Sequence, residues 1–107
     1  MSLIETKLAA MGYELPPTPT PVAAYVPAVR TGNLVFVSGQ VPREKGELKY
    51  QGYVGDDVTL WQAQAAARLC ALNALAAVKS VAGSLDKVKR IVKLTGFVRS
   101  AKGFGDQ

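Results

Sequence analysis

The chain has 107 residues, of which 49% are apolar and 20% are charged, a composition that suits a folded domain rather than a disordered segment. It holds no apolar run near the roughly 20 residues that a bilayer-spanning helix needs. Its N-terminus also lacks the basic and apolar segments of a signal peptide. We therefore expect a single domain over residues 1–107, located in the cytoplasm and with no membrane partner.

The side-chain inventory excludes several kinds of chemistry. The chain has no histidine, which is the commonest zinc ligand and the commonest general base near neutral pH. Zinc-dependent hydrolysis and serine–histidine catalysis are thereby excluded. Cys70 is the only cysteine and lies among alanine and leucine residues in a helical pattern, so we expect a small apolar side chain there rather than a nucleophile.

The net charge of +5 is concentrated near the C-terminus. Residues 1–78 hold equal numbers of basic and acidic side chains, whereas residues 79–107 hold seven basic and two acidic ones. Such a basic segment could contact nucleic acid or an anionic ligand. It could also be one half of a charge pattern whose acidic partner lies elsewhere, and we favour this second interpretation.

Residues 1–21 are predicted to form an N-terminal helix and a proline-rich connector. Ser2 and Glu5 have the spacing of a helix-capping box, and Gly12 is suited to end the helix. Four prolines between Leu15 and Pro21 exclude a helix or a central strand there, because proline lacks the amide hydrogen. We interpret this connector as a surface linker, with a ligand for a proline-reading partner as the alternative.

A β-hairpin is predicted next. Residues 22–29 and 34–40 are extended apolar segments on either side of a Thr-Gly-Asn turn, and we expect them to pair antiparallel. The second segment ends in Ser38 and Gly39, which place a hydroxyl and an unhindered backbone where a ligand could approach. The alternative is a core strand that ends in an ordinary turn. A charged turn over residues 43–47 and a short third strand over Leu48–Tyr53 are predicted to follow.

A long helix and a final strand complete the pattern. Thr59 and Gln62 have capping-box spacing, and an alanine- and leucine-rich segment runs from there to about Ala82, with Gly83 as its stop. From Val88 the sequence alternates with a period of two over about ten residues, which predicts a strand. The helix positions expected to face a sheet are Ala65, Leu69, Leu72 and Ala76. This order of elements favours an α+β fold with helices packed on one face of a sheet.

Several motifs, in this order, resemble the YjgF/Rid family, whose members also appear as endoribonuclease L-PSP or translation initiation inhibitors. The most informative segment runs from Thr31 to Pro42 (Thr-Gly-Asn-Leu-Val-Phe-Val-Ser-Gly-Gln-Val-Pro). The others are residues 25–27 (Tyr-Val-Pro), 55–58 (Gly-Asp-Asp-Val), 64–67 (Gln-Ala-Ala-Ala), 71–73 (Ala-Leu-Asn), 83–88 (Gly-Ser-Leu-Asp-Lys-Val) and 96–98 (Gly-Phe-Val). The similarity runs from about Ile4 to Gln107 and is greatest to the branch with the longer N-terminal helix and proline segment.

The resemblance implies a chorismate-mutase-like (YjgF-like) α+β fold, assembled as a homotrimer with ligand clefts between subunits. It also implies hydrolysis of reactive enamines and imines to a keto acid and ammonia, with a small carboxylate-bearing metabolite as partner and neither cofactor nor metal. In that family a late arginine grips the substrate carboxylate and a glutamate near the C-terminus positions or activates water. Both belong to a segment beyond Gln107.

We therefore expect the C-terminal helix and strand of the fold, together with the catalytic residues, to be missing from this chain. The apolar face formed by Leu94, Gly96 and Val98 would then be uncovered, and the edge of that strand would be unpaired. An incomplete domain would also explain the uneven charge.

Carried over residue by residue, the resemblance makes Tyr25, Ser38 and Gly39 the substrate-binding candidates. Tyr25 would lie at the wall of the cleft, and Ser38 and Gly39 at the strand end where ligand oxygens meet a hydroxyl and a backbone amide. For Tyr25 the alternative is packing across the subunit contact. Arg99 precedes the family's arginine position, so we treat it as a surface charge, and Lys102 stands near where some relatives place an asparagine.

Three functions are in view. The first is Rid-type hydrolysis of enamines and imines, and the second is a non-catalytic homotrimer that binds a small ligand or regulates through the same cleft. The third is an RNA-acting protein of the L-PSP endoribonuclease type. We place RNA last, and expect no nucleic-acid partner, because no cluster of stacking aromatics accompanies the basic segment and no histidine pair is present for RNA cleavage.

Overall fold

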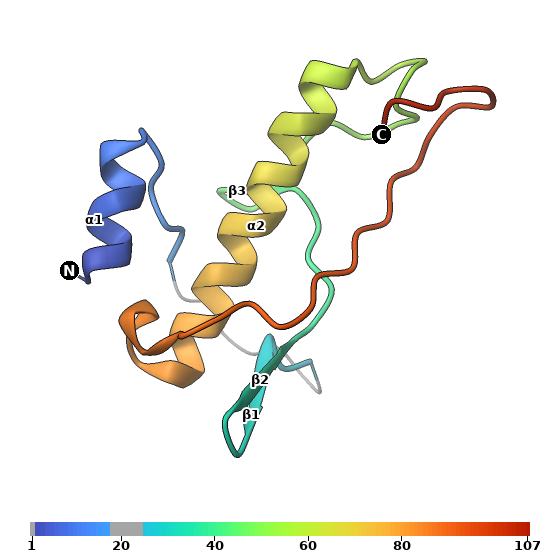
Figure 1. Cartoon of the computed structure of the whole chain (residues 1–107). Coiled ribbons are helices and arrows are strands. Elements are labelled where there is room, and N and C mark those ends of the chain that lie inside the picture. Colours follow the sequence, from blue (N-terminus) through green and yellow to red (C-terminus); the bar gives the residue numbers. More distant parts are fainter. Residues whose placement is uncertain (1, 18–24) are drawn as a thin grey trace.

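The computed structural model describes residues 2–17 and 25–107 as one long helix, a β-hairpin and several shorter elements. The predicted connector from residue 18 and the start of the predicted hairpin, residues 22–24, lie outside the described residues. The elements in chain order are α1 (Leu3–Ala10), β1 (Ala28–Thr31), β2 (Leu34–Val37), β3 (Arg43–Glu44), β4 (Glu47–Leu48), α2 (Leu60–Ala82) and the 3-10 helix η1 (Leu85–Lys87) (Figure 1).

The predicted hairpin is confirmed. β1 pairs antiparallel with β2, in a register that places Ala28 opposite Val37 and Thr31 opposite Leu34. Only Gly32 and Asn33 connect the two strands, and Gly32 has a φ of +56°. A two-residue hairpin loop of type II′ needs this left-handed conformation at its first position, which glycine adopts without steric cost.

The predicted long helix is confirmed as α2. The Thr59 hydroxyl accepts a hydrogen bond from the Gln62 N–H at 3.1 Å, and the Gln62 side chain accepts one from the Thr59 N–H at 3.0 Å, so both halves of the capping box form. The helix ends at Gly83, whose φ is +85°. Within the described part of the chain, α2 alone is long and apolar enough to cross a membrane, a property that core helices of soluble proteins share.

The core lies where α2 meets the hairpin and the loops that follow. α2 contacts β1, β2, β3 and η1, and the hairpin lies toward its C-terminal end in Figure 1. Of the positions predicted to face a sheet, Ala76 is buried and the other three are half-buried. The fully buried apolar side chains are small for the most part: Ala28, Val54, Val58, Ala76, Ala77 and Leu85. Small side chains let the helix and the hairpin approach closely, but they bury little apolar surface.

The N-terminal helix α1 packs against η1. Ser2 caps it as predicted, since its hydroxyl accepts a hydrogen bond from the Glu5 N–H at 3.0 Å. The Asp86 carboxylate accepts two further hydrogen bonds, from the N–H groups of Leu3 at 2.9 Å and Ile4 at 3.0 Å. Amide groups in the first turn of a helix have no partner within the helix, so Asp86 supplies one from a distant part of the sequence.

Two side-chain contacts join the N-terminal segment to the polar side of α2. The Glu5 carboxylate lies 2.9 Å from the Lys79 ammonium group, so this glutamate pairs with α2 rather than closing a capping box on Ser2. The Arg68 guanidinium lies 5.2 Å from the centre of the Tyr13 ring. Arg68 and Lys79 of α2 therefore hold the segment after α1 and α1 itself.

The predicted third strand over Leu48–Tyr53 is wrong for most of its length. Only Glu47–Leu48 pairs, with Arg43–Glu44, around the tight turn at Lys45 and Gly46. Tyr50 has a φ of +56°, a left-handed conformation that a strand cannot accommodate. The Lys49 N–H still donates to the Pro42 carbonyl at 2.8 Å, so the hairpin pairing ends just before Tyr50.

The predicted strand from Val88 does not form. Residues 88–99 are extended, but none pairs in a β-ladder with another described residue, and Figure 1 shows them as a trace without an arrow. The predicted uncovered face is confirmed: Leu94 is 88% exposed and Val98 49%. Period-two alternation specifies which side chains share a face, whereas a ladder also needs a neighbouring strand. The described strands therefore form two separate two-stranded sheets, and the chain is an α+β structure with short strands and one long helix.

Candidate functional site

The three residues predicted to bind substrate lie together at the end of β2. We call Tyr25, Ser38 and Gly39 the strand-end cluster. The Ser38 N–H donates a hydrogen bond to the Pro27 carbonyl at 2.9 Å, which extends the pairing of β1 and β2 by one step. The Ser38 hydroxyl donates to the Val26 carbonyl at 2.6 Å. Because a hydroxyl has one proton and two lone pairs, the Ser38 oxygen can still accept hydrogen bonds from a ligand.

Tyr25 and Gly39 are joined directly. The Tyr25 hydroxyl donates a hydrogen bond to the Gly39 carbonyl at 3.2 Å, while the tyrosine side chain stays 55% exposed. The Gly39 N–H has no hydrogen-bond acceptor among the described residues. A methyl group built on Gly39 would meet no atom within 4 Å, so the space in front of this backbone is open. The cluster thus offers a ligand one free amide donor and one hydroxyl acceptor.

Two polar side chains that sequence reasoning missed hold the strand end in place. The Gln40 side chain donates to the Ser38 carbonyl at 2.9 Å. The Asn73 side chain, on α2, donates to the carbonyls of Val41 at 3.2 Å and Arg43 at 2.9 Å. An asparagine within the alanine- and leucine-rich stretch 71–77 of the helix is the signal that could have identified this contact, since a half-buried amide there needs partners.

Arg99 is exposed, as predicted for a surface charge. Its guanidinium lies 4.0 Å from the centre of the Tyr53 ring and donates a hydrogen bond to the Tyr53 hydroxyl at 2.9 Å. A cation–π contact and a hydrogen bond therefore hold this surface side chain against the loop before α2. Lys102 is exposed, as is the backbone around it.

Cys70 is half-buried on α2, and burial raises the pKa of its thiol. The thiol form is therefore favoured at neutral pH, which agrees with the predicted role as an apolar side chain. Among residues 2–17 and 25–107, no group of three or more His, Cys, Asp or Glu side chains could hold a metal ion.

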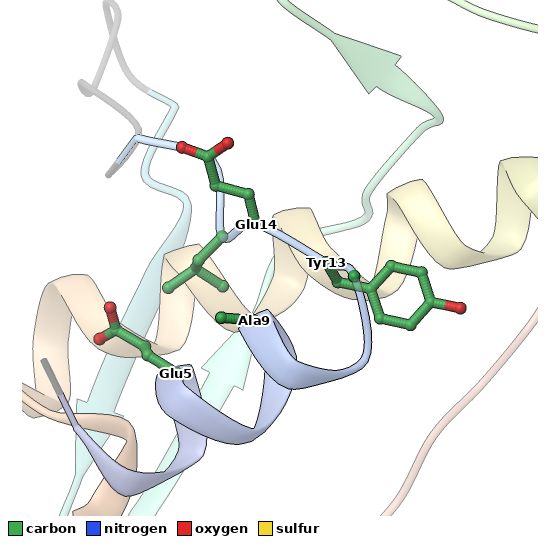
Figure 2. Close-up of a pocket in the computed structure, with 6 residues that line it drawn as sticks. Glu5, Ala9, Tyr13 and Glu14 are labelled. Carbon is green, nitrogen blue, oxygen red and sulfur yellow. The ribbon is translucent and has the colours of Figure 1, made fainter.

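Two open hollows lie elsewhere on the surface. Figure 2 shows the first, of about 510 Å³, where the Glu5 and Glu14 carboxylates border the hollow over Ala9 while the Tyr13 ring points away from it. The second, of about 320 Å³, is mainly apolar and is formed by α1, α2, η1 and the start of the extended segment. Neither hollow includes Tyr25, Ser38 or Gly39. A ligand at the strand-end cluster would thus lie on an open surface of this chain.

The fold and the strand-end cluster define the class of protein. A family model described as "YjgF/chorismate_mutase-like, putative endoribonuclease" matches residues 5–104, and the chain belongs to this family. The resemblance seen in the sequence is thereby confirmed.

Three relatives show how much of the family's length is present. Protein TCP17 of Trypanosoma cruzi is 38% identical over 104 residues, which are 97% of this chain and 65% of that protein. The crystal structure of Atu1372 from Agrobacterium tumefaciens, described as of unknown function, is 47% identical with a TM-score of 0.87, over 97% of this chain and 64% of that one. A "putative endoribonuclease" from Shewanella oneidensis MR-1 is 40% identical with a TM-score of 0.73, over 81% and 58%. The chain therefore spans less than two thirds of the length of these relatives.

Proposed function

We propose that the protein acts in Rid-type hydrolysis of reactive enamines and imines, with the strand-end cluster as part of its substrate site. In this reaction water adds to the carbon of the C=N bond, the C–N bond breaks, and a keto acid and ammonia are released. The observation that carries the proposal is that the Gly39 N–H, for which no described residue supplies an acceptor, directly follows Ser38, whose hydroxyl oxygen can still accept hydrogen bonds. The amide can donate to a substrate carboxylate, and the hydroxyl oxygen can accept from an imine N–H.

A neighbouring subunit is proposed to complete the site. Small-molecule sites bury about 70–90% of the ligand surface, whereas Tyr25 and Gly39 are both exposed in a single chain. A homotrimer with clefts between subunits, as the family resemblance implies, would enclose a ligand there. Tyr25 would form the wall of such a cleft, and its hydrogen bond to Gly39 would fix the position of the ring.

The cluster supplies positioning but no carboxylate or basic side chain. Its one titratable group, the Tyr25 phenol, already donates its proton to the Gly39 carbonyl, and general acid–base catalysis of hydrolysis needs a group that can exchange a proton with water or substrate near the reacting carbon. We propose that this group, and the cation that grips the substrate carboxylate, belong to parts of the family fold outside the cluster.

A coupled assay tests this proposal. An amino-acid dehydratase would generate the imine in the presence of the purified protein, and keto-acid release would be followed by its absorbance. Because the catalytic residues are expected beyond Gln107, we expect faster release with a protein of the relatives' full length that contains these residues, rather than with the 107 residues alone. The acceleration should fall about tenfold for Ser38→Ala, the size of effect expected when one hydrogen bond of about 1.4 kcal/mol is lost. Met11→Ala, an exposed change on α1, is the matched control. Unchanged keto-acid release would rule out the proposed reaction.

The uncharged nature of the cluster specifically favours a second candidate, a ligand-binding protein without turnover. Calorimetry with a small keto acid would then detect binding although the coupled assay shows no acceleration. Gly39→Ala is a sharp probe, because the added methyl group meets nothing within 4 Å in this chain and should leave its folding unchanged. Loss of binding in this variant would place the ligand at the cluster, and unaltered binding would place it elsewhere.

RNA binding is a third candidate, supported by two observations. Phe97 is 93% exposed between the cations Lys93 and Arg99, and the Shewanella relative is described as a "putative endoribonuclease". An affinity for single-stranded RNA that falls steeply with salt and is lost in Phe97→Ala would support it. Affinity that Phe97→Ala leaves unchanged would show that the exposed ring takes no part.

A further inference from the structure

The Asn73 side chain on α2 holds a tight turn that follows the strand-end cluster. Its amide nitrogen donates hydrogen bonds to the carbonyl oxygens of Val41 at 3.2 Å and Arg43 at 2.9 Å. The Arg43 N–H also donates to the Val41 carbonyl, at 2.7 Å, which closes a three-residue turn around Pro42. A side-chain amide has two N–H donors, so Asn73 can bond to both ends of this turn at once.

Asn73 lies on the side of α2 that is most deeply buried. Ala76 and Ala77, three and four residues further along the helix, have 2% and 0% of their surface exposed. Residues at these spacings share one face of a helix, and side chains as small as alanine let a neighbouring backbone come within reach of the short asparagine. Asparagine is a poorer helix former than alanine or leucine. Its presence in this stretch is therefore explained by the contacts it makes rather than by helix stability.

Gly39 lies between two anchors of the same segment. On one side, the Ser38 N–H donates to the Pro27 carbonyl at 2.9 Å and ties the segment to the hairpin. On the other side, Asn73 holds the Val41 carbonyl. Gly39 itself forms no backbone–backbone hydrogen bond with a described residue, and glycine has the widest choice of backbone conformations. The direction of the Gly39 N–H therefore depends on where the two anchors hold the chain.

We propose that Asn73 is a positioning residue of the strand-end cluster, acting through the turn at Pro42. It fixes the far end of the segment that carries Ser38 and Gly39, so that the Gly39 N–H is already directed at the substrate carboxylate before the substrate arrives. The Gln40 side chain adds a local support through its hydrogen bond to the Ser38 carbonyl. Binding to a donor that is already ordered avoids the cost of ordering it. The inference rests on the proposed function of the cluster, whether that is turnover or binding alone.

Loss of the Asn73 donor should weaken substrate binding more than it slows the chemical step. In Asn73→Ala the carbonyls of Val41 and Arg43 would turn to water, and each binding event would have to order the segment again. In the coupled assay, with a protein of the relatives' full length, we expect KM to rise about three- to tenfold. We expect kcat to stay within about twofold, as for an interaction that substrate and transition state share.

Two further variants separate the donor from the size of the side chain. Asn73→Asp keeps the volume but lacks the donor, so its KM should rise at least as much as that of Asn73→Ala. Asn73→Ser retains one hydroxyl donor and should lie between the parent and Asn73→Ala, and it replaces them should both other variants fail to fold. A KM equal to that of the parent in every folded variant would overturn the inference.

Thr59→Ala is the matched control for stability. It removes a hydrogen bond at the start of the same helix without touching the turn, and should leave KM unchanged. Because Asn73 acts through the segment that carries Ser38, the effects of Asn73→Ala and Ser38→Ala on KM should combine to less than their product, whereas those of Thr59→Ala and Ser38→Ala should be independent. Equal increases in KM for Thr59→Ala and Asn73→Ala would show that helix stability alone is responsible and would overturn the inference.

Nuclear magnetic resonance relaxation of the backbone gives a readout that needs no substrate. In Asn73→Ala the order parameter of the Gly39 N–H should fall from about 0.85, typical of rigid backbone, toward the flexible range below about 0.6, and in Thr59→Ala it should not change. If the parent shows neither turnover nor keto-acid binding, the proposed function fails, while this measurement still decides whether Asn73 positions the strand end. An order parameter of Gly39 that Asn73→Ala leaves unchanged would overturn the inference.

Discussion

The carboxylate of Asp86 accepts a hydrogen bond from the backbone N–H of Leu3 at 2.9 Å, across 83 residues of sequence. The same carboxylate accepts the N–H of Ile4. Both bonds favour the ionised form, and they lower the pKa of Asp86, with the Leu3 bond as the larger cause and the Ile4 bond next. The attachment of α1 to η1 therefore depends on a charge.

We predict that acid releases α1 before it unfolds α2. A lowered pKa means that the Asp86 contact stabilises the fold above the ordinary aspartate pKa of about 3.9 and is lost as the pH falls through the lower folded value. Amide hydrogen exchange of residues 3–10 should accelerate in this range. Asp86→Asn should show faster exchange in α1 already at neutral pH, and no difference from the parent chain would contradict the prediction.

Thr59→Ala should lower the free energy of unfolding by about 1 kcal/mol, because the variant cannot accept the Gln62 N–H at the start of α2. Thr59→Ser keeps the hydroxyl and should stay within about 0.5 kcal/mol of the parent. Urea unfolding followed by circular dichroism measures both. Equal midpoints for Thr59→Ala and Thr59→Ser would show that the cap contributes little.

Asn73→Ala should lower the free energy of unfolding by about 1–3 kcal/mol, since it leaves the carbonyls of Val41 and Arg43 without their side-chain donor. Asn73→Asp should lower the free energy of unfolding more than Asn73→Ala near neutral pH, because a carboxylate would face two carbonyl oxygens. Thermal unfolding of the three chains checks this order. A more stable Asp variant would mean that the side chain can turn away at little cost.

Gly55→Ala should destabilise the loop before α2 by more than about 1 kcal/mol for two separate reasons. Gly55 has a φ of +94°, and a Cβ there would lie 2.5 Å from the Phe104 ring. Adding Phe104→Ala to Gly55→Ala should restore the stability lost to the clash with the ring. It should not restore the stability lost to the strained backbone conformation. A double-mutant cycle separates the two, and full recovery would show that the backbone conformation costs nothing.

Local signals predicted the elements whose determinants are local. The Ser2 cap, the Thr59–Gln62 capping box, the turn at Gly32 and the stop at Gly83 act on residues within one turn, and each forms as expected, whereas the Glu5 side chain pairs with Lys79 instead of completing a box on Ser2. Ser38 and Gly39 were candidates because they end a strand, and Tyr25 was a candidate only through the family resemblance. The structure joins Tyr25 to Gly39 by a hydrogen bond. Whether these residues bind substrate stays a prediction.

Contacts between residues far apart in the sequence were the part of the fold that could not be predicted. The alternation from Val88 predicted a strand, but no periodicity names the strand that should lie alongside, and both faces of this segment are exposed. The left-handed Tyr50 was equally hidden, since a tyrosine in an extended pattern carries no sign of positive φ. In the sequence, Asp86 is one residue of the family motif 83–88, and nothing there indicates that its carboxylate binds the N-terminus of α1. Only the folded chain brings the two together.

Residues 91–98 are anchored at both ends, by η1 on one side and by the contacts of Arg99 with Val54 and Tyr53 on the other. A protease that cuts after Lys93 would therefore nick the molecule without separating its pieces. We expect the C-terminal fragment to remain attached through the two backbone bonds of Val54 and the Tyr53–Arg99 pair. The nicked protein should elute from a sizing column with its parent and come apart only in denaturant.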